Sequence, residues 1–171
     1  ADQAVENLQW EHSYYVDADH INLDTVDPFI EHSNFFTLDV AEFLGKEVPD
    51  EDLRAFLDTA SRYTGELEIP GIGQPFQVSS GTLDRIARKF LGAVREAASI
   101  YSHIASQKGS DHFVAEISMD EVEHPQNPTE LFFILLMIKH YDIPVQTIAP
   151  KFTGRFNKGV DYVGDVVQFR K

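Results

Sequence analysis

Short apolar segments alternate along this chain with longer segments that have helical spacing, and this alternation restricts the fold more than any other feature. The strand-like segments are 14–17, 35–39, 113–118 and 144–148. The helical segments lie near 50–61, 82–107 and 128–140, with a small helical turn after Leu23. Strands separated by helices are typical of a parallel sheet with helices outside it. The sequence therefore predicts an α/β fold of parallel strands alternating with helices.

The length of the chain leaves two architectures open. With 171 residues, 43% of them hydrophobic, it can bury the core of one domain, and it holds no internal repeat or flexible linker. We therefore expect a single α/β domain over residues 1–171. Four strands are too few to close a barrel of eight. The domain is predicted to be either a small open sheet or part of a larger barrel.

Two segments carry further structural expectations. The helix over 128–140 is apolar on every side, so Phe132, Phe133, Leu135 and Leu136 are all expected to be buried between layers. The segment 63–81 is rich in proline and glycine, which predicts irregular structure there.

Charge and composition exclude several classes of protein. The formal net charge of −14 disfavours binding to nucleic acid, because a phosphate backbone would be repelled. The longest purely apolar run, 131–138, is too short to cross a bilayer. The absence of cysteine excludes disulfides and thiolate metal sites and favours the reducing cytoplasm. A small anionic ligand remains compatible with this composition, since a local cationic loop can override the global charge.

The first candidate cluster follows the first predicted strand. Asp17, Asp19 and His20 lie there, where parallel α/β folds bind ligands beyond the carboxyl ends of their strands. Carboxylate and imidazole groups suit a divalent metal such as Zn²⁺, Mn²⁺ or Ni²⁺, so Asp19 and His20 are predicted metal ligands and Asp17 a catalytic acid or base. The alternative is that Asp19 or Asp24 caps a helix and His20 is merely exposed.

The second cluster follows the third predicted strand. Glu116 lies inside an apolar strand, where an ionised carboxylate needs a metal, a cation or hydrogen bonds. Glu116, Ser118 and Asp120 share one parity and are expected to line one surface. We predict catalytic roles for Glu116 and Asp120, with Glu116 also a metal ligand. The alternative is a solvent-facing strand edge with an acidic loop after it.

The third cluster is cationic and follows the fourth predicted strand. Lys151, Arg155 and Lys158 are separated by small residues and can hold a carboxylate or phosphate, with Arg155 offering a two-pronged contact. Gln146, within the strand, is assigned to the same substrate site. The alternative is a solvated basic loop. Because the ends of parallel strands face one side, all three clusters are expected to form one pocket.

Two stretches of the sequence resemble a known family. They are VDADHINLDTVDPFIEHSNFFTLDVA and VAEISMDEVEHPQNPTELFFILLMIKHYDIPVQTIAPKFTGRFNKGVDYVGDV, of which APKFTGRFNKGVDYVGD is the most specific. They are similar to the tagaturonate epimerases, also called tagaturonate/fructuronate epimerases, from about Tyr14 onward. The resemblance implies a metal-dependent epimerase of ketohexuronates, active in hexuronate catabolism and built on a TIM-like (β/α) barrel. Members are considerably longer, so the chain is expected to be a piece of a barrel, inactive alone.

The resemblance leaves two reaction routes open for epimerisation, and two other functions are alternatives to it. Epimerisation can proceed through removal and return of a proton beside a carbonyl, or through retro-aldol cleavage and re-addition. One competing hypothesis is a metal-dependent sugar aldolase or isomerase that uses the same strand-end acids. The other is a sugar-binding module without catalysis, in which the cations hold the ligand.

Overall fold

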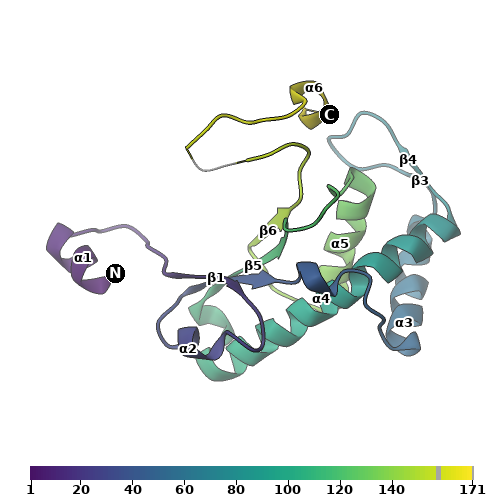
Figure 1. Ribbon diagram of the computed structural model, residues 1–171. Helices are drawn as coiled ribbons and strands as arrows, with labels where there is room; N and C mark the ends of the chain where they lie inside the picture. The colour runs from purple at the N-terminus through teal and green to yellow at the C-terminus, as the bar shows by residue number, and fades with distance from the viewer. Residues whose placement is uncertain (157–158, 171) are drawn as a thin grey trace.

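The computed structural model describes residues 1–156 and 159–170 of the chain. Its centre is a four-stranded parallel sheet with the strand order β1-β2-β5-β6. These strands are β1 (Asp17–Ile21), β2 (Phe35–Asp39), β5 (Val114–Met119) and β6 (Thr147–Pro150). Figure 1 shows helices gathered below the sheet and the C-terminal segment rising above it. Parallel strands alternating with helices are present, so the predicted α/β class is confirmed.

Three long helices cover one face of the sheet. They are α3 (Asp50–Ala60), α4 (Ser80–Lys108) and α5 (Pro128–His140), and they confirm the predicted helices. The Ser79 side chain accepts a hydrogen bond from the Thr82 amide at the start of α4. A reciprocal capping box between Asn127 and Glu130 begins α5. Shorter helices are α1 (Asp2–Leu8), α2 (Asp27–Ile30) and α6 (Val166–Phe169), with 3-10 turns at Ala41–Phe43, Ser61–Tyr63 and Ser110–His112.

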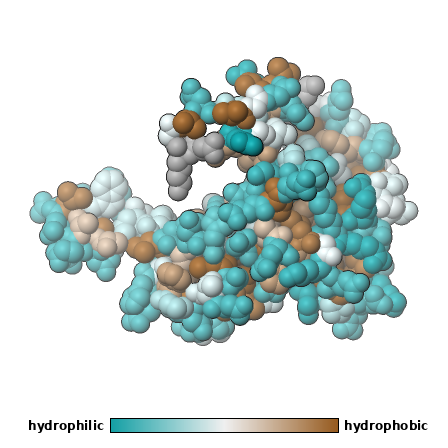
Figure 2. All heavy atoms as spheres, in the orientation of Figure 1, coloured by the Kyte–Doolittle hydropathy of each residue, from teal (hydrophilic) through white to brown (hydrophobic). Residues whose placement is uncertain are grey.

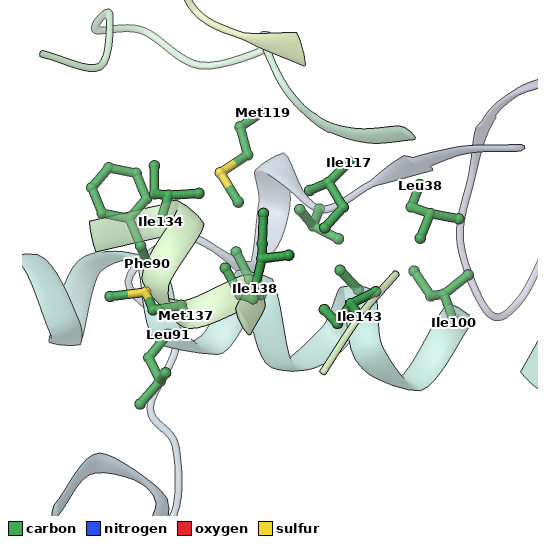
Figure 3. Close-up of a cluster of buried hydrophobic side chains, with 14 of the residues drawn as sticks. Leu38, Phe90, Leu91, Ile100, Ile117, Met119, Ile134, Met137, Ile138 and Ile143 are labelled. Atoms are coloured by element: carbon green, nitrogen blue, oxygen red, sulfur yellow. The ribbon is translucent and has the colours of Figure 1, made fainter. Parts of the chain in front are cut away.

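The hydrophobic core fills the space between the sheet and these helices. Alternate residues of the two central strands, Phe36, Leu38, Ala115 and Ile117, point into it and are fully buried. Figure 3 shows the helix and loop side chains that meet them, among which Phe90, Leu91, Ile100, Ile134, Met137 and Ile143 are labelled. The intervening residues, such as Thr37 and Glu116, consequently point to the opposite face, away from α4 and α5, which we call the open face. This open face is polar, and all the candidate acids of the strands lie on it or at its edge.

Two predicted strands are displaced from their observed positions. Strand β1 begins at Asp17, where the prediction over 14–17 ends, because the polar residues after it belong to the open face and not to a loop. Strand β6 runs over Thr147–Pro150 and not over 144–148. Pro150 can close this strand because β6 pairs only with β5 in the described sheet, so the missing amide breaks no ladder bond.

Two further expectations need correction, and one helix lies outside the predicted elements. Leu135 is 49% exposed, so helix α5 is not buried on every side, although Phe133 is fully buried and Phe132 and Leu136 are partly so. The segment predicted to be irregular contains a small antiparallel pair, β3 (Gly65–Leu67) and β4 (Phe76–Val78). Helix α1 was not predicted and has no buried residue. Within the described residues, no helix is long and apolar enough to cross a membrane.

Candidate functional site

A register shift in β1 sets the geometry of the first cluster. Ala18 pairs with Phe36 and Ile21 with Leu38, so three steps along β1 match two steps along β2, as in a β-bulge. Ala18 and Ile21 therefore both point into the core, where each is 2% exposed. The intervening Asp19 and His20 are both left outside the core. His20 adopts a left-handed backbone conformation with φ of 55°, which is uncommon for residues other than glycine.

The His20 imidazole lies among carboxylates from two strand ends. Its Nδ1 lies 2.8 Å from Asp19 Oδ1. Its Nε2 lies 3.7 Å from Asp120 Oδ1 and 3.9 Å from Glu121 Oε1, beyond the end of β5. Burial is the largest single influence on the pKa of His20 and lowers it. The hydrogen bond and charge of Asp19, with the charges of Glu121 and Asp120, together outweigh burial, so the pKa lies above its usual value.

A second group of acids lies further back on the open face. Thr37 Oγ1 lies 3.4 Å from each carboxylate oxygen of Asp17, and Thr37 pairs in register with Glu116 on the next strand. Burial raises the pKa of the Asp17 carboxyl, and the negative charges of Asp19 and Glu116 raise it further. A carboxyl group with a raised pKa on a polar sheet face holds its proton more readily than an ordinary carboxyl, which suits a group that accepts and returns protons.

A cleft of about 520 Å³ opens beyond the carboxyl ends of β5 and β6. Asp120 contributes an acid to its wall, while Lys151 and Arg155 contribute cations. Three aromatic side chains from the C-terminal segment, Phe152, Phe156 and Phe169, complete the lining. Figure 2 shows apolar side chains in brown on this segment, which stands above the body of the molecule. The cleft therefore joins an acid, two cations and aromatic faces in one concave space.

Hydrogen bonds hold Asp120 and Lys151 at the edge of this cleft. Ser118 Oγ donates to Asp120 Oδ1 over 2.7 Å. The backbone amide of Lys151 donates to the side-chain oxygen Oε1 of Gln126. The backbone amide of Gln126 donates to the Lys151 carbonyl over 3.1 Å. The loops that follow β5 and β6 are thereby tied together at the mouth of the cleft.

The structure brings most of the predicted site residues together, but not all. Asp19, His20 and Asp120 meet at the strand ends, and Lys151 and Arg155 share the cleft with Asp120. Gln146 lies outside this arrangement, because its Oε1 accepts from the Ala115 amide and its Nε2 donates to the Pro144 carbonyl. Lys158 lies outside the described residues.

Among the described residues, the predicted metal ligands Asp19, His20 and Glu116 are not gathered into one three-ligand group. Across residues 1–156 and 159–170, no group of three histidine, aspartate or glutamate side chains is placed to hold a metal ion. Asp19 and His20 contact each other directly, while Glu116 lies further back beside Thr37.

The sequence prediction overlooked the aromatic lining of the cleft. Phe152, Phe156 and Phe169 were not singled out, although Phe152 and Phe156 lie among glycine and charged residues, where a core position is unexpected. They are 52%, 58% and 41% exposed, which identifies them as surface groups available to a ligand or to neighbouring protein.

Comparison with known proteins identifies the family. A family model described as "UxaE: tagaturonate epimerase" matches residues 2–171. The chain belongs to this tagaturonate epimerase family. A tagaturonate/fructuronate epimerase from Thermotoga maritima is 25% identical over 166 residues, which cover 91% of this chain and 34% of that protein. The resemblance to the tagaturonate epimerases seen in the sequence is thus confirmed.

Solved structures support the fold assignment. A glycerol-complexed crystal structure of the fructuronate-tagaturonate epimerase UxaE from Cohnella laeviribosi superposes with a TM-score of 0.75 and 22% identity, covering 98% of this chain and 36% of that one. The native structure of the same epimerase gives a TM-score of 0.71, also at 22% identity and with the same coverage. The chain spans about a third of the length of these relatives.

Proposed function

We propose that this chain forms part of the active site of an epimerase that interconverts tagaturonate and fructuronate. One observation carries the proposal. Asp120 lines the cleft that holds Lys151 and Arg155, and it also lies 3.7 Å from the His20 imidazole. Groups for binding an anion and groups for moving a proton are thus adjacent. Family membership supports the choice of a ketohexuronate as the substrate.

In this proposal the cleft binds the substrate by its charged end. Lys151 and Arg155 have no acidic partner among the described residues, so both are available to the substrate carboxylate. The rings of Phe152, Phe156 and Phe169 offer apolar faces to the carbon skeleton of the sugar acid, as in other small-molecule pockets. The carboxylate of the substrate would then lie away from the reacting carbon.

The acids on the open face are the proposed proton carriers. Asp17 has a raised pKa, which suits a group that takes a proton in one half of the reaction and returns it in the other. Glu116 and Asp120 are proposed to share this work, because they lie on the same face and at its carboxyl end. The proposed role of Gln146 is not retained, since both ends of its side chain are engaged.

We also propose that the whole enzyme uses a divalent metal, Zn²⁺, Mn²⁺ or Ni²⁺. Because the described residues lack a three-ligand group, Asp19 and His20 are proposed to contribute only part of the ligand set. The four-stranded sheet is proposed to be one portion of a (β/α) barrel, and the enzyme is proposed to act in hexuronate catabolism in the cytoplasm.

Product analysis with the intact protein tests this function. We expect nuclear magnetic resonance to show interconversion of tagaturonate and fructuronate without cleavage products. Release of shorter sugar fragments would favour an aldolase, and tight binding without conversion would favour a binding module. Dialysis against a chelator should abolish turnover, and adding back Zn²⁺, Mn²⁺ or Ni²⁺ should restore it. Turnover that survives chelation with no metal in the protein would refute the metal dependence.

A further inference from the structure

Tyr162 contacts both sides of the loop that carries Arg155. We propose that Tyr162 is a positioning residue that holds Arg155 in the cleft, and this inference rests on the proposed role of Arg155 in binding the substrate carboxylate. Arg155 is exposed and its side chain has no ion pair within the described chain. Contacts made by the backbone around Arg155 must therefore hold its side chain in place for ligand binding.

The backbone of Arg155 is paired with the far side of the loop. The Arg155 amide donates to the Val163 carbonyl over 2.8 Å, and the Val163 amide donates to the Arg155 carbonyl over 3.1 Å. Tyr162 adds a third connection, because its hydroxyl donates to the Thr153 carbonyl over 2.9 Å. The residues on both sides of Gly154 are thus fixed to neighbouring residues of one short segment, 162–163.

Two glycines make room for the Tyr162 ring. A Cβ atom added at Gly154 or at Gly164 would overlap the Tyr162 hydroxyl and the ring carbon that bears it. Gly154 also has a φ of +84°, a conformation that other residues rarely adopt. The phenol therefore occupies a slot that exists only because both positions lack a side chain. The fit of the ring between these two glycines, like its hydrogen bond to Thr153, indicates that Tyr162 holds the two sides of the loop together.

The same ring connects the loop to the aromatic wall of the cleft. Its centroid lies 5.0 Å from that of Phe156 and 5.2 Å from that of Phe169, and both phenylalanines line the cleft. Tyr162 itself is absent from the cleft lining. It therefore acts through its neighbours, by holding the Thr153 carbonyl before Arg155 and by packing on the Phe156 ring after it, and not by touching the ligand. Ordering this loop before binding lowers the entropy lost when the ligand binds.

Steady-state kinetics of the intact epimerase with tagaturonate tests the inference. Tyr162→Phe keeps the ring and removes the hydrogen bond to Thr153. We expect KM to rise about two- to tenfold, the range for one neutral hydrogen bond, while kcat changes less than twofold. Gly164→Ala, which crowds the ring without a positive φ to complicate it, should raise KM in the same way. Tyr14→Phe is the matched control, since it loses a hydroxyl bond of 3.0 Å to Asp2 outside the cleft.

A double-variant cycle separates positioning from a general structural effect. In the Arg155→Ala background, Tyr162→Phe should cause no further rise in KM, because the group that it positions is gone. Additive effects, or an unchanged KM in Tyr162→Phe, would overturn the inference and leave the proposed function intact. An unchanged KM in Arg155→Ala alone would overturn both the inference and the proposed binding role of Arg155.

Discussion

The Nε2 atom of His20 lies 3.7 Å from Oδ1 of Asp120, although strand β2 lies between β1, which carries His20, and β5, which Asp120 directly follows. His20 can reach across β2 to Asp120 because the register shift in β1 turns His20 away from the core. A left-handed backbone at a non-glycine residue costs of order 1–3 kcal/mol, and such strain concentrates at functional positions. The strain at His20 is therefore consistent with a functional role for this contact.

The charge of Asp19 should control the protonation of His20. Asp19 contributes both a hydrogen bond and a negative charge, and each raises the pKa of the imidazole. In Asp19→Asn the charge is lost while burial still acts to lower the pKa, so we expect the pKa of His20 to fall. A titration of the histidine ring resonances by nuclear magnetic resonance measures this change. The His103 resonance is the internal control, because its contact with Asp27 lies on another part of the molecule; an unmoved His20 titration would contradict the prediction.

Ionisation of Asp17 should reduce the stability of the folded chain. The pKa of Asp17 is raised on folding, so the stability that this group contributes is present at low pH and is lost as pH rises through the folded pKa. Asp17→Asn removes this loss and keeps an oxygen that can accept from Thr37. We expect the variant to be more stable than the parent at pH 7, and the difference to vanish below the ordinary carboxyl pKa.

Denaturant unfolding over a range of pH measures the effect of Asp17, and Asp27→Asn supplies a control of opposite sign. The hydrogen bond with His103 lowers the pKa of Asp27, so its contribution is present above the ordinary carboxyl pKa and lost as pH falls. The Asp27 variant should therefore be less stable than the parent at neutral pH. If both variants shift stability in the same direction, the assignment for Asp17 is wrong.

Two adjacent residues of α5 should respond very differently to truncation. Ile134 is fully buried against the core, so Ile134→Ala should cost about 2–5 kcal/mol through the cavity that it leaves. Leu135 is 49% exposed, and Leu135→Ala should cost less than about 1 kcal/mol. Denaturant unfolding of both variants at one pH gives the comparison. Equal losses would show that Leu135 packs against something in solution.

How far the sequence predicted this fold depended on whether apolar or polar residues dominate each strand. Strand β2 was predicted at its observed bounds and β5 to within one residue, because apolar residues dominate both. Strand β1 was displaced because Asp19 and His20, which are polar, were assigned to a loop after the strand. The register shift depends on how β1 pairs with β2, and the amino-acid composition of β1 does not predict that pairing. Gln146 was misplaced for a related reason, since its bonds to Ala115 and Pro144 depend on the neighbouring strand.

The strand-end clusters were predictable because parallel strands deliver their carboxyl ends to one edge. Asp120, Lys151 and Arg155 lie around one cleft as that rule requires. The aromatic wall was not predicted, because Phe156 and Phe169 approach each other only through the folding of the C-terminal loop. The metal ligands remain a prediction, since no three-residue group forms within the described chain.

Substrate binding and proton transfer should be separable by mutation in the full-length enzyme. Arg155 lines the cleft, so Arg155→Ala should mainly raise KM, by an amount that corresponds to a charge-assisted hydrogen bond of about 1.5–3 kcal/mol. Glu116 pairs in register with Thr37 and Thr147 on the open face, at a distance from the cleft lining. Glu116→Gln keeps the shape of the side chain and removes its charge, so we expect turnover to be lost while the unfolding midpoint stays unchanged. Glu123→Gln, at an exposed loop position, is the matched control and should retain the parent kcat. If Glu116→Gln keeps the parent kcat, Glu116 is only a polar residue of the open face, and proton transfer must rest on Asp17 and Asp120.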